Sequence, residues 1–141
     1  MLEKVISELE KGIDPDRAEH TQHYFGIRPG GYGEGDILLG IRSPHIRSVA
    51  REYRKLPLKD VTSLLVSPVH EFRFCALAIL ALQYPKQPEA CLKIFLDNIN
   101  HVNNWDLVDC FSPHILGRWC YENHDESILK RLNRSEEHTS E

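Results

Sequence analysis

The sequence lacks an apolar stretch long enough to cross a bilayer. Its central apolar segment, CALAILAL at residues 75–82, is far shorter than the roughly 20 residues that a membrane-spanning helix needs. The N-terminal segment, MLEKVISELEK, is acidic and amphipathic, with no basic region followed by an apolar one, so it does not have the pattern of a signal peptide. We therefore expect a cytoplasmic protein that makes no contact with a membrane.

Cysteine is sparse and never occurs as C-x-x-C. The four cysteines, at positions 75, 91, 110 and 120, are well separated, and an intracellular setting favours reduced thiols packed on helices. Cys110 and His114, like Cys120 and His124, are four residues apart, a spacing that can present two zinc ligands on one helical face. Pro113 interrupts the first pair and is expected to begin a new helix. We therefore expect core thiols, with no metal and no other cofactor.

Glycine is nearly confined to one segment, because six of the eight glycines lie in GIRPGGYGEGDILLG, residues 26–40. No strand pattern precedes this segment and no G-K-[ST] follows it, so it lacks the context of a nucleotide-binding phosphate loop. We expect a glycine-rich connector over residues 26–43, between an N-terminal helical hairpin at 1–25 and a series of helical repeats.

Alternation of apolar and polar residues with a period of two is absent, whereas apolar residues recur with helical spacing. Four X-Pro pairs place a capping side chain before a proline at the first helical position, and they begin at Asp14, Ser43, Ser67 and Ser112. These patterns predict an all-α protein with helices near residues 2–11, 15–25, 44–55, 58–66, 68–84, 88–100, 104–111 and 113–122. Short connections favour an α–α superhelix of the HEAT or armadillo type, with a compact helical bundle as the alternative.

Basic residues are concentrated in one segment, although the whole chain has a formal charge of −4. Residues 42–59 contain six lysines and arginines but a single acid, Glu52. Such a patch is typical of a surface that binds nucleic-acid phosphates. A solvated helix surface is the alternative for each basic residue. The first candidates for DNA contact are Arg47, Arg51 and Arg54, on one side of the predicted 44–55 helix, and the further candidates are Arg42, Arg73 and Arg118.

The segment HVNNWDLVD, residues 101–109, contains two acids with different expected roles. Asp106 falls in the first turn of the predicted helix, where a carboxylate interacts with the helix dipole, so a capping role accounts for it. Asp109 has no such role: at about 100° per residue it points roughly 160° away from Phe111, on the expected core side, and shares a face with Trp105. A packed tryptophan beside a solvated acid is the alternative.

Three blocks of the sequence occur in a consistent order: YGEGDILLGIRSPHIRSVAREYRKLP (32–57), SPVHEFRFCALAIL (67–80) and NHVNNWDLVDCFSPHILG (100–117). Together they resemble the HEAT-like repeat DNA alkylation repair proteins, a family of bacterial alkylpurine DNA glycosylases. The resemblance runs from about Tyr24 to Trp119. It rests on the agreement of all three blocks and not on any one motif.

The resemblance implies a superhelix of helical repeats whose concave, positively charged face binds double-stranded DNA containing alkylated purines. It implies hydrolytic excision of N3- and N7-alkylated purines without a metal, with Asp109 as the catalytic aspartate and Trp105 as a tryptophan of the lesion site. The full-length protein is expected to be a monomer. A non-catalytic DNA-binding relative and a HEAT-type protein-interaction scaffold are the alternative functions.

The C-terminal part of the sequence departs from the family pattern. The helices that follow in the family, one of them carrying a second active-site tryptophan, have no counterpart here. Residues 134–141, RSEEHTSE, match one reading frame of a widely used short-read sequencing adapter. We therefore expect an incomplete repeat domain over residues 44–133, truncated at its C-terminus and followed by a non-native tail at 134–141.

Overall fold

The computed structural model describes residues 1–18, 37–98 and 110–123. The elements in these ranges are all helical: α1 (Leu2–Glu10), α3 (Ser43–Glu52), α4 (Leu58–Leu65), α5 (His70–Gln83), α6 (Pro88–Asn98), the π-helical turn η2 (Pro113–Gly117) and α8 (Arg118–Asn123). The only extended pairing described is a single bridge between Ile37 and Val69. The all-α prediction is confirmed for this part of the chain, in which no helix is long and apolar enough to span a membrane.

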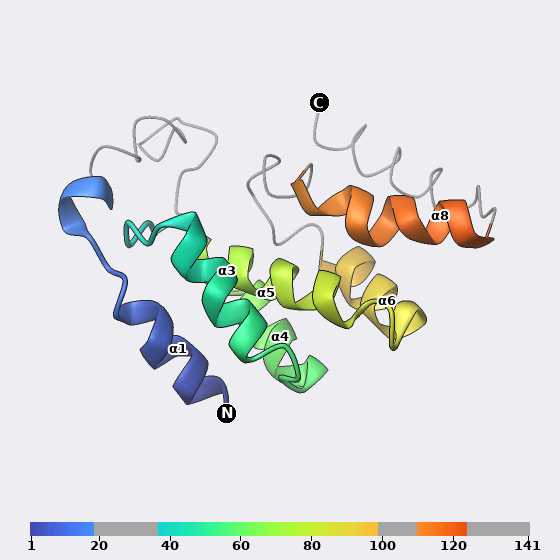
Figure 1. Cartoon of the computed structure of the whole chain (residues 1–141), viewed down its shortest axis with the longest axis horizontal. Helices are drawn as coiled ribbons and strands as arrows, with labels where there is room; N and C mark the ends of the chain where they lie inside the picture. The colour runs from blue at the N-terminus through green and yellow to red at the C-terminus, as the bar shows by residue number, and fades with distance from the viewer. Residues whose placement is uncertain (19–36, 99–109, 124–141) are drawn as a thin grey trace.

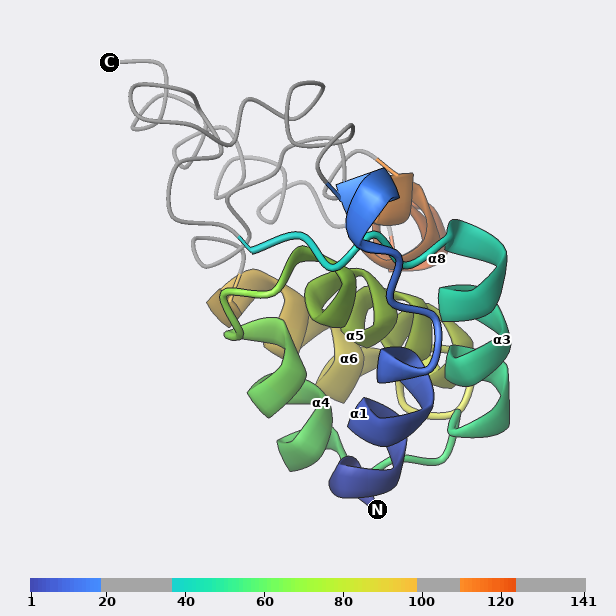
Figure 2. The ribbon, with the colours of Figure 1, turned by 90° about the vertical axis from the view of Figure 1, so that its left-hand side faces the viewer.

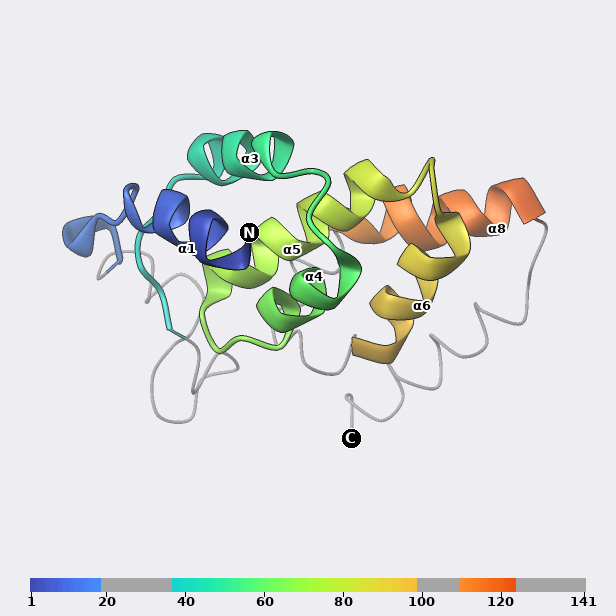
Figure 3. The same cartoon turned by 90° about the horizontal axis from the view of Figure 1, so that it is seen from below.

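The helices follow one another along the longest axis of the molecule, from α1 at one end to α8 at the other (Figure 1). α5 is central, and it packs against α3, α4, α6 and η2; Figure 2 shows it between α3 and α4. α4 also contacts α6, and α1 contacts α3. α3 therefore lies beside α5, and α4 lies beside both α5 and α6, as the view from below shows (Figure 3).

The helices bury the sides that the apolar spacing predicts. Val5 and Leu9 of α1 are fully buried, and so are Ile46 and Val49 of α3 to within a few per cent. In α5 all six residues from 75 to 80 are buried, which agrees with its central place, because a helix that is apolar on all sides requires neighbours on all sides. The core is therefore continuous from α1 to η2.

The Ser-Pro pairs mark helix starts less uniformly than the sequence predicts. α3 begins at Ser43 itself, with Arg42 as its N-cap and no side-chain capping bond. α5 begins two residues later than predicted, at His70, because the Ser67 hydroxyl instead accepts a hydrogen bond from the Val69 N–H (3.1 Å). Such a hydrogen bond, from a backbone N–H to the serine hydroxyl two residues earlier, forms a turn that competes with helix formation.

The predicted break at Ser112–Pro113 is wrong. Residues 110–123 form one helical run, and Ser112 has helical angles (φ −55°, ψ −43°) instead of capping a new helix. Proline inside an α-helix loses one hydrogen bond, and its ring crowds the carbonyl one turn earlier. The widened turn η2 accommodates this loss, with the Arg118 N–H directed to the carbonyls of Ile115 and Pro113. Such π-turns are a known way of absorbing an irregular residue within a helix.

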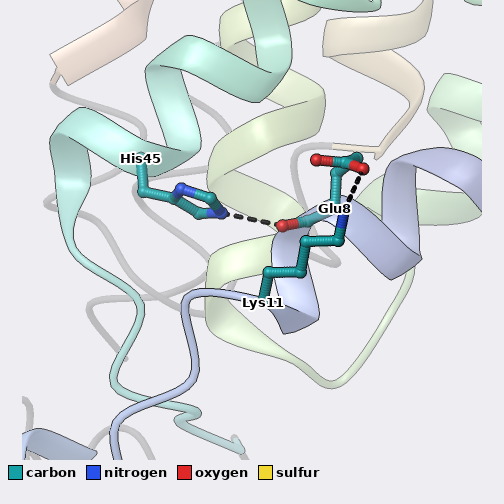
Figure 4. A network of polar contacts seen from close by, with 3 residues as sticks. All are labelled: Glu8, Lys11 and His45. Carbon is teal, nitrogen blue, oxygen red and sulfur yellow. Dashed lines mark hydrogen bonds and ion pairs between the residues drawn. The ribbon is translucent and has the colours of Figure 1, made fainter.

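Glu8 connects α1 to the first turn of α3 (Figure 4). Its backbone carbonyl lies 2.7 Å from His45 Nε2, and because a carbonyl can only accept, Nε2 carries the proton and donates. Its carboxylate accepts a hydrogen bond from Lys11 Nζ (2.6 Å), which raises the pKa of Lys11. Gly12 leaves room for the imidazole, since a Cβ added there would lie 2.6 Å from His45 Cδ2.

The segment before α3 is attached to α5 by a buried carboxylate. Glu71, 3% exposed, accepts backbone N–H bonds from Leu39 (3.1 Å), Gly40 (2.8 Å) and Ile41 (3.2 Å). Gly40 has φ +78°, and a Cβ there would lie 2.0 Å from the Asp14 carbonyl oxygen. Glycine is therefore required at position 40, both for its left-handed conformation and for the close approach of residue 14.

Candidate DNA interface

The predicted catalytic pair, Trp105 and Asp109, lies outside the described residues. The described chain resumes at Cys110, the residue directly after Asp109 in sequence. The helical run 110–123 therefore contains the described residues that lie nearest in sequence to the predicted pair, and its contacts define the candidate site.

Phe111 anchors the start of this run in the core. It is 2% exposed, as its predicted place on the core side requires. Its ring meets that of Phe74 of α5 edge to face, with centroids 5.3 Å apart and an interplanar angle of 87°. This is a favoured geometry for aromatic pairs, and it fixes the start of the run relative to the central helix.

Arg47 of α3 joins the same cluster. Its guanidinium carbon lies 5.3 Å from the centroid of Phe74 and 5.6 Å from that of Phe111. One of its terminal nitrogens is 3.9 Å from Cys110 Sγ. A guanidinium at this distance from a ring is attracted by the negative ring face. Arg47 therefore connects α3 with the two residues that directly follow Asp109.

A cavity of about 260 Å³ opens beside this cluster, between α3, α5 and the 110–123 run. We call it the arginine groove. Its floor is apolar, from the small side chains of α3 and α5 and from Leu82 and Phe111. Its charged lining is basic: Arg47 and Arg51 come from α3, and Arg118 from α8, with His114 beside them. Among the described residues that line it there is no carboxylate, so this part of the groove attracts anions.

Arg118 is oriented by two neighbours. Its Nε donates to Glu122 one turn later (2.9 Å), and its guanidinium carbon lies 5.1 Å from the ring centroid of Tyr84 at the end of α5. Burial, followed by the charge of Glu122, raises the pKa of Tyr84, so this phenol stays neutral. The ion pair is half exposed and contributes little to stability, but it holds the guanidinium at the groove.

The predicted DNA-contact residues occupy four different places. Arg47, Arg51 and Arg118, which are up to 71 residues apart in sequence, come together at the arginine groove. Arg54 is exposed at a second cavity, and Arg42 is exposed at the N-cap of α3.

Arg73 differs from the other predicted DNA-contact residues. It is 1% exposed and donates to the Ser67 carbonyl (3.2 Å), so it packs inside the fold and does not belong to the surface set.

Sequence reasoning missed several of the polar residues that matter here. Lys55 and Lys86 line the second cavity with Arg54. Lys55 belongs to the basic segment 42–59 but was not among the predicted contacts, and Lys86 was missed because only helix packing brings the α5–α6 turn near the end of α3. Glu71 was also missed, although its spacing indicates burial. It lies one turn before Cys75 and two turns before Ala78, so it shares the apolar side of its helix with them. Within the described ranges, no group of three or more His, Cys, Asp or Glu is arranged to hold a metal ion.

The buried cysteines are not reactive groups of this site. Burial raises the pKa of Cys75 to about 12 and that of Cys91 to about 11, so both are neutral thiols near neutral pH. Cys110 is exposed and Cys120 is partly exposed. The two buried thiols therefore pack as apolar groups, as the sequence predicts for all four cysteines; for the exposed Cys110 the prediction of a core thiol is wrong.

Comparison with known protein families decides the family of the chain. A family model described as "DNA alkylation repair enzyme" matches residues 5–138. The chain belongs to this DNA alkylation repair family. The match includes every residue that lines the arginine groove, and it also includes Trp105 and Asp109. Searches of curated proteins and of solved structures found no match.

Proposed function

We propose that this member of the DNA alkylation repair family excises N3- and N7-alkylated purines by hydrolysing the N-glycosidic bond, with the damaged duplex held at the arginine groove. In this proposal Asp109 is the catalytic carboxylate and Trp105 contacts the lesion. The proposal rests on the family, whose members act on DNA alkylation damage, and on the chemistry of the groove.

The contact of Arg47 with Cys110 and Phe111 is the observation that carries the proposal. It brings a groove lined by three guanidinium groups against the segment that directly follows Asp109 in the chain. Arginine is well suited to binding phosphodiesters, because its planar fork donates several hydrogen bonds. Phosphate contacts position a protein on DNA, and here they would position the duplex beside residue 109.

The chemistry proposed for Asp109 and Trp105 follows from the nature of the substrate. A purine alkylated at N3 or N7 is already cationic and is a good leaving group. The remaining need is to stabilise the positive charge that develops on the deoxyribose and to hold an attacking water. A carboxylate near the sugar does both. The electron-rich face of an indole favours the same cationic species.

The stacking of helices supports the proposed α–α superhelix over a compact bundle. α3 contacts α5, α5 contacts η2, and α4 contacts both α5 and α6, so the helices of one pair lie beside those of the next pair along the chain. In a solenoid each unit contacts mainly the next one, and α1 and α8 lie at opposite ends (Figure 1). The arginine groove lies between the first helices of the successive units.

The test compares two aspartates of the same segment. Asp109→Asn keeps the size of the side chain and removes its charge, and we expect it to abolish release of 7-methylguanine and 3-methyladenine from methylated DNA. DNA binding should be nearly unchanged. Asp106→Asn is the matched control and should retain release, because the role expected of Asp106 is capping. Released bases are measured by chromatography and binding by fluorescence anisotropy.

Three outcomes separate the candidate functions. Release that is unaffected by Asp109→Asn would remove the catalytic assignment. Binding without any release by the unmodified protein would favour a non-catalytic DNA-binding relative. Affinity for DNA that does not fall with salt would favour a protein-interaction scaffold, because phosphate contacts release counterions and are salt-dependent.

A further inference from the structure

A second basic cavity, of about 300 Å³, lies between the end of α3 and the turn that joins α5 to α6. Its lining residues are Arg54, Lys55, Leu82, Gln83, Lys86 and Gln87. Of these described lining residues, three are cations and none is an acid. Like charges held near one another destabilise the folded state by mutual repulsion. An anion bound among these three cations would relieve that repulsion, so the cavity is suited to an anion.

The side chain of Gln83, which is 8% exposed, connects the two segments that form this cavity. Its Nε2 donates to the Leu56 carbonyl (2.7 Å), and its Oε1 accepts from Gln87 Nε2 (2.7 Å). These bonds attach the α3–α4 connection to the α5–α6 turn. The buried hydrogen bond from Gln83 to Leu56 therefore holds the two segments that carry Lys55 and Lys86 beside each other.

Arg54 is also held in place before any ligand binds. Its Nη1 donates to the Arg51 carbonyl near the C-terminal end of α3 (3.0 Å). A cation at a helix C-terminus is favoured by the helix dipole. The bond uses one of the five N–H donors of the guanidinium, so donors remain for an anion.

The second cavity adjoins the arginine groove, because Leu82 lines both. Leu82 is 42% exposed, which is unusual for a leucine on the central helix. The side chains of Arg47, Arg51 and Arg118 lie around one cavity and those of Arg54, Lys55 and Lys86 around the next, with this apolar residue between them. Charged groups separated by an apolar one match a DNA strand, whose phosphates are separated by deoxyribose.

We propose that the cavity formed by Arg54, Lys55 and Lys86 is a second phosphate-binding site, which holds another phosphodiester of the DNA bound at the arginine groove. Leu82 contacts the sugar between the two phosphates. The inference rests on the proposed function, since it takes the groove to be the DNA-binding surface. It extends the DNA contact from the predicted arginines to two lysines on separate loops.

The test uses the whole chain and an undamaged duplex, so it does not depend on base excision. Lys86→Met removes one charge and keeps the length of the side chain. Each lost phosphate contact lowers the slope of log affinity against log salt by about 0.9, which corresponds to roughly eight-fold weaker binding near 0.1 M salt. We expect this change for Lys86→Met, and we expect Lys86→Arg to bind like the unmodified protein.

Lys59→Met is the matched control. Lys59 belongs to the same basic stretch of sequence and is exposed on α4, but it lines neither cavity. Its replacement removes the same charge and should leave both the affinity and the salt slope unchanged. Thermal melting of each variant, followed by circular dichroism, confirms that the fold is retained.

Each outcome is decisive for one of the two proposals. If Lys86→Met binds DNA like the unmodified protein while Arg51→Met weakens binding, the second site is wrong and the groove stands. If Lys59→Met loses as much affinity as Lys86→Met, only total charge matters, and the second site is again wrong. If the unmodified protein shows no salt-dependent binding, the proposed function itself fails.

Discussion

The carboxylate of Glu71 provides a direct test of how the glycine-containing segment before α3 is held. The three N–H groups of residues 39–41 all donate to it, and the side chain is 3% exposed. Glu71→Gln keeps the size of the side chain, replaces one acceptor oxygen by an NH₂ donor and removes the charge. We expect this single change to destabilise the protein substantially.

The size of the effect follows from the hydrogen bonds. The N–H groups of Gly40 and Ile41 both donate to Oε2, and an amide oxygen in that place would keep both bonds without the assistance of charge, at a loss of about 1 kcal/mol each. The Leu39 N–H lies 3.1 Å from both carboxylate oxygens, so it would face the NH₂ group on one side and keep the amide oxygen as its acceptor, again without the assistance of charge, at a loss of about 1 kcal/mol. The expected loss over the three bonds is about 3 kcal/mol, a large share of the roughly 5–15 kcal/mol by which a domain is stable.

Urea and thermal denaturation followed by circular dichroism measure this loss. For a chain of this length, about 3 kcal/mol corresponds to a melting temperature lower by roughly 10 °C. Glu52→Gln is the control: Glu52 is an exposed acid at the end of α3, and its replacement should change the free energy of unfolding by less than about 0.5 kcal/mol. A Glu71→Gln protein as stable as this control would refute the role assigned to the buried carboxylate.

Two further predictions concern the groove and the thiols. Arg47→Met, which loses the guanidinium stacked on two rings, should lower the free energy of unfolding by about 1–2 kcal/mol. Arg51→Met, in the same groove, should cost less than about 0.5 kcal/mol; equal losses in urea denaturation would contradict the stacking argument. Because the pKa of Cys75 is raised to about 12 and that of Cys91 to about 11, a disulfide reagent at pH 8 should modify only Cys110 and Cys120 in the folded protein and all four in denaturant. Rapid modification of more than two thiols in the folded protein would contradict the burial of Cys75 and Cys91. Unfolding exposes these two thiols, which then lose their protons near pH 8.5, so the free energy of unfolding should fall as the pH rises above about 9.

Helix existence and the buried sides of helices were predictable because both depend on local spacing. Val5 and Leu9 in α1, and Ile46 and Val49 in α3, recur every three or four residues, and each pair is buried as that spacing requires. The exact starts were less predictable. Ser67 makes a turn instead of a helix cap, because its hydroxyl has more than one backbone N–H within reach.

The interruption at Pro113 was predicted wrongly for a tertiary reason. Proline alone favours a new helix start, but Phe111, Ile115 and Leu116 are all buried, and one continuous helical run keeps these side chains in the core. Packing therefore outweighs the lost hydrogen bond, and a π-turn absorbs the irregularity. The sequence carries the proline signal without the competing contacts.

The composition of the basic surface was visible in the sequence, but its arrangement was not. Helical spacing showed that Arg47 and Arg51 share a side of α3, because they lie one turn apart. It did not show that Arg118 joins them, that Arg73 is buried at 1% exposure, or that Lys86 lines a second cavity together with Lys55. Those outcomes depend on which helices pack together. Contacts between residues far apart in the chain produce no regular spacing in the sequence from which they could be predicted. The sequence alone therefore determined the helices, their apolar sides and the family resemblance, whereas the tertiary structure decided which charges meet.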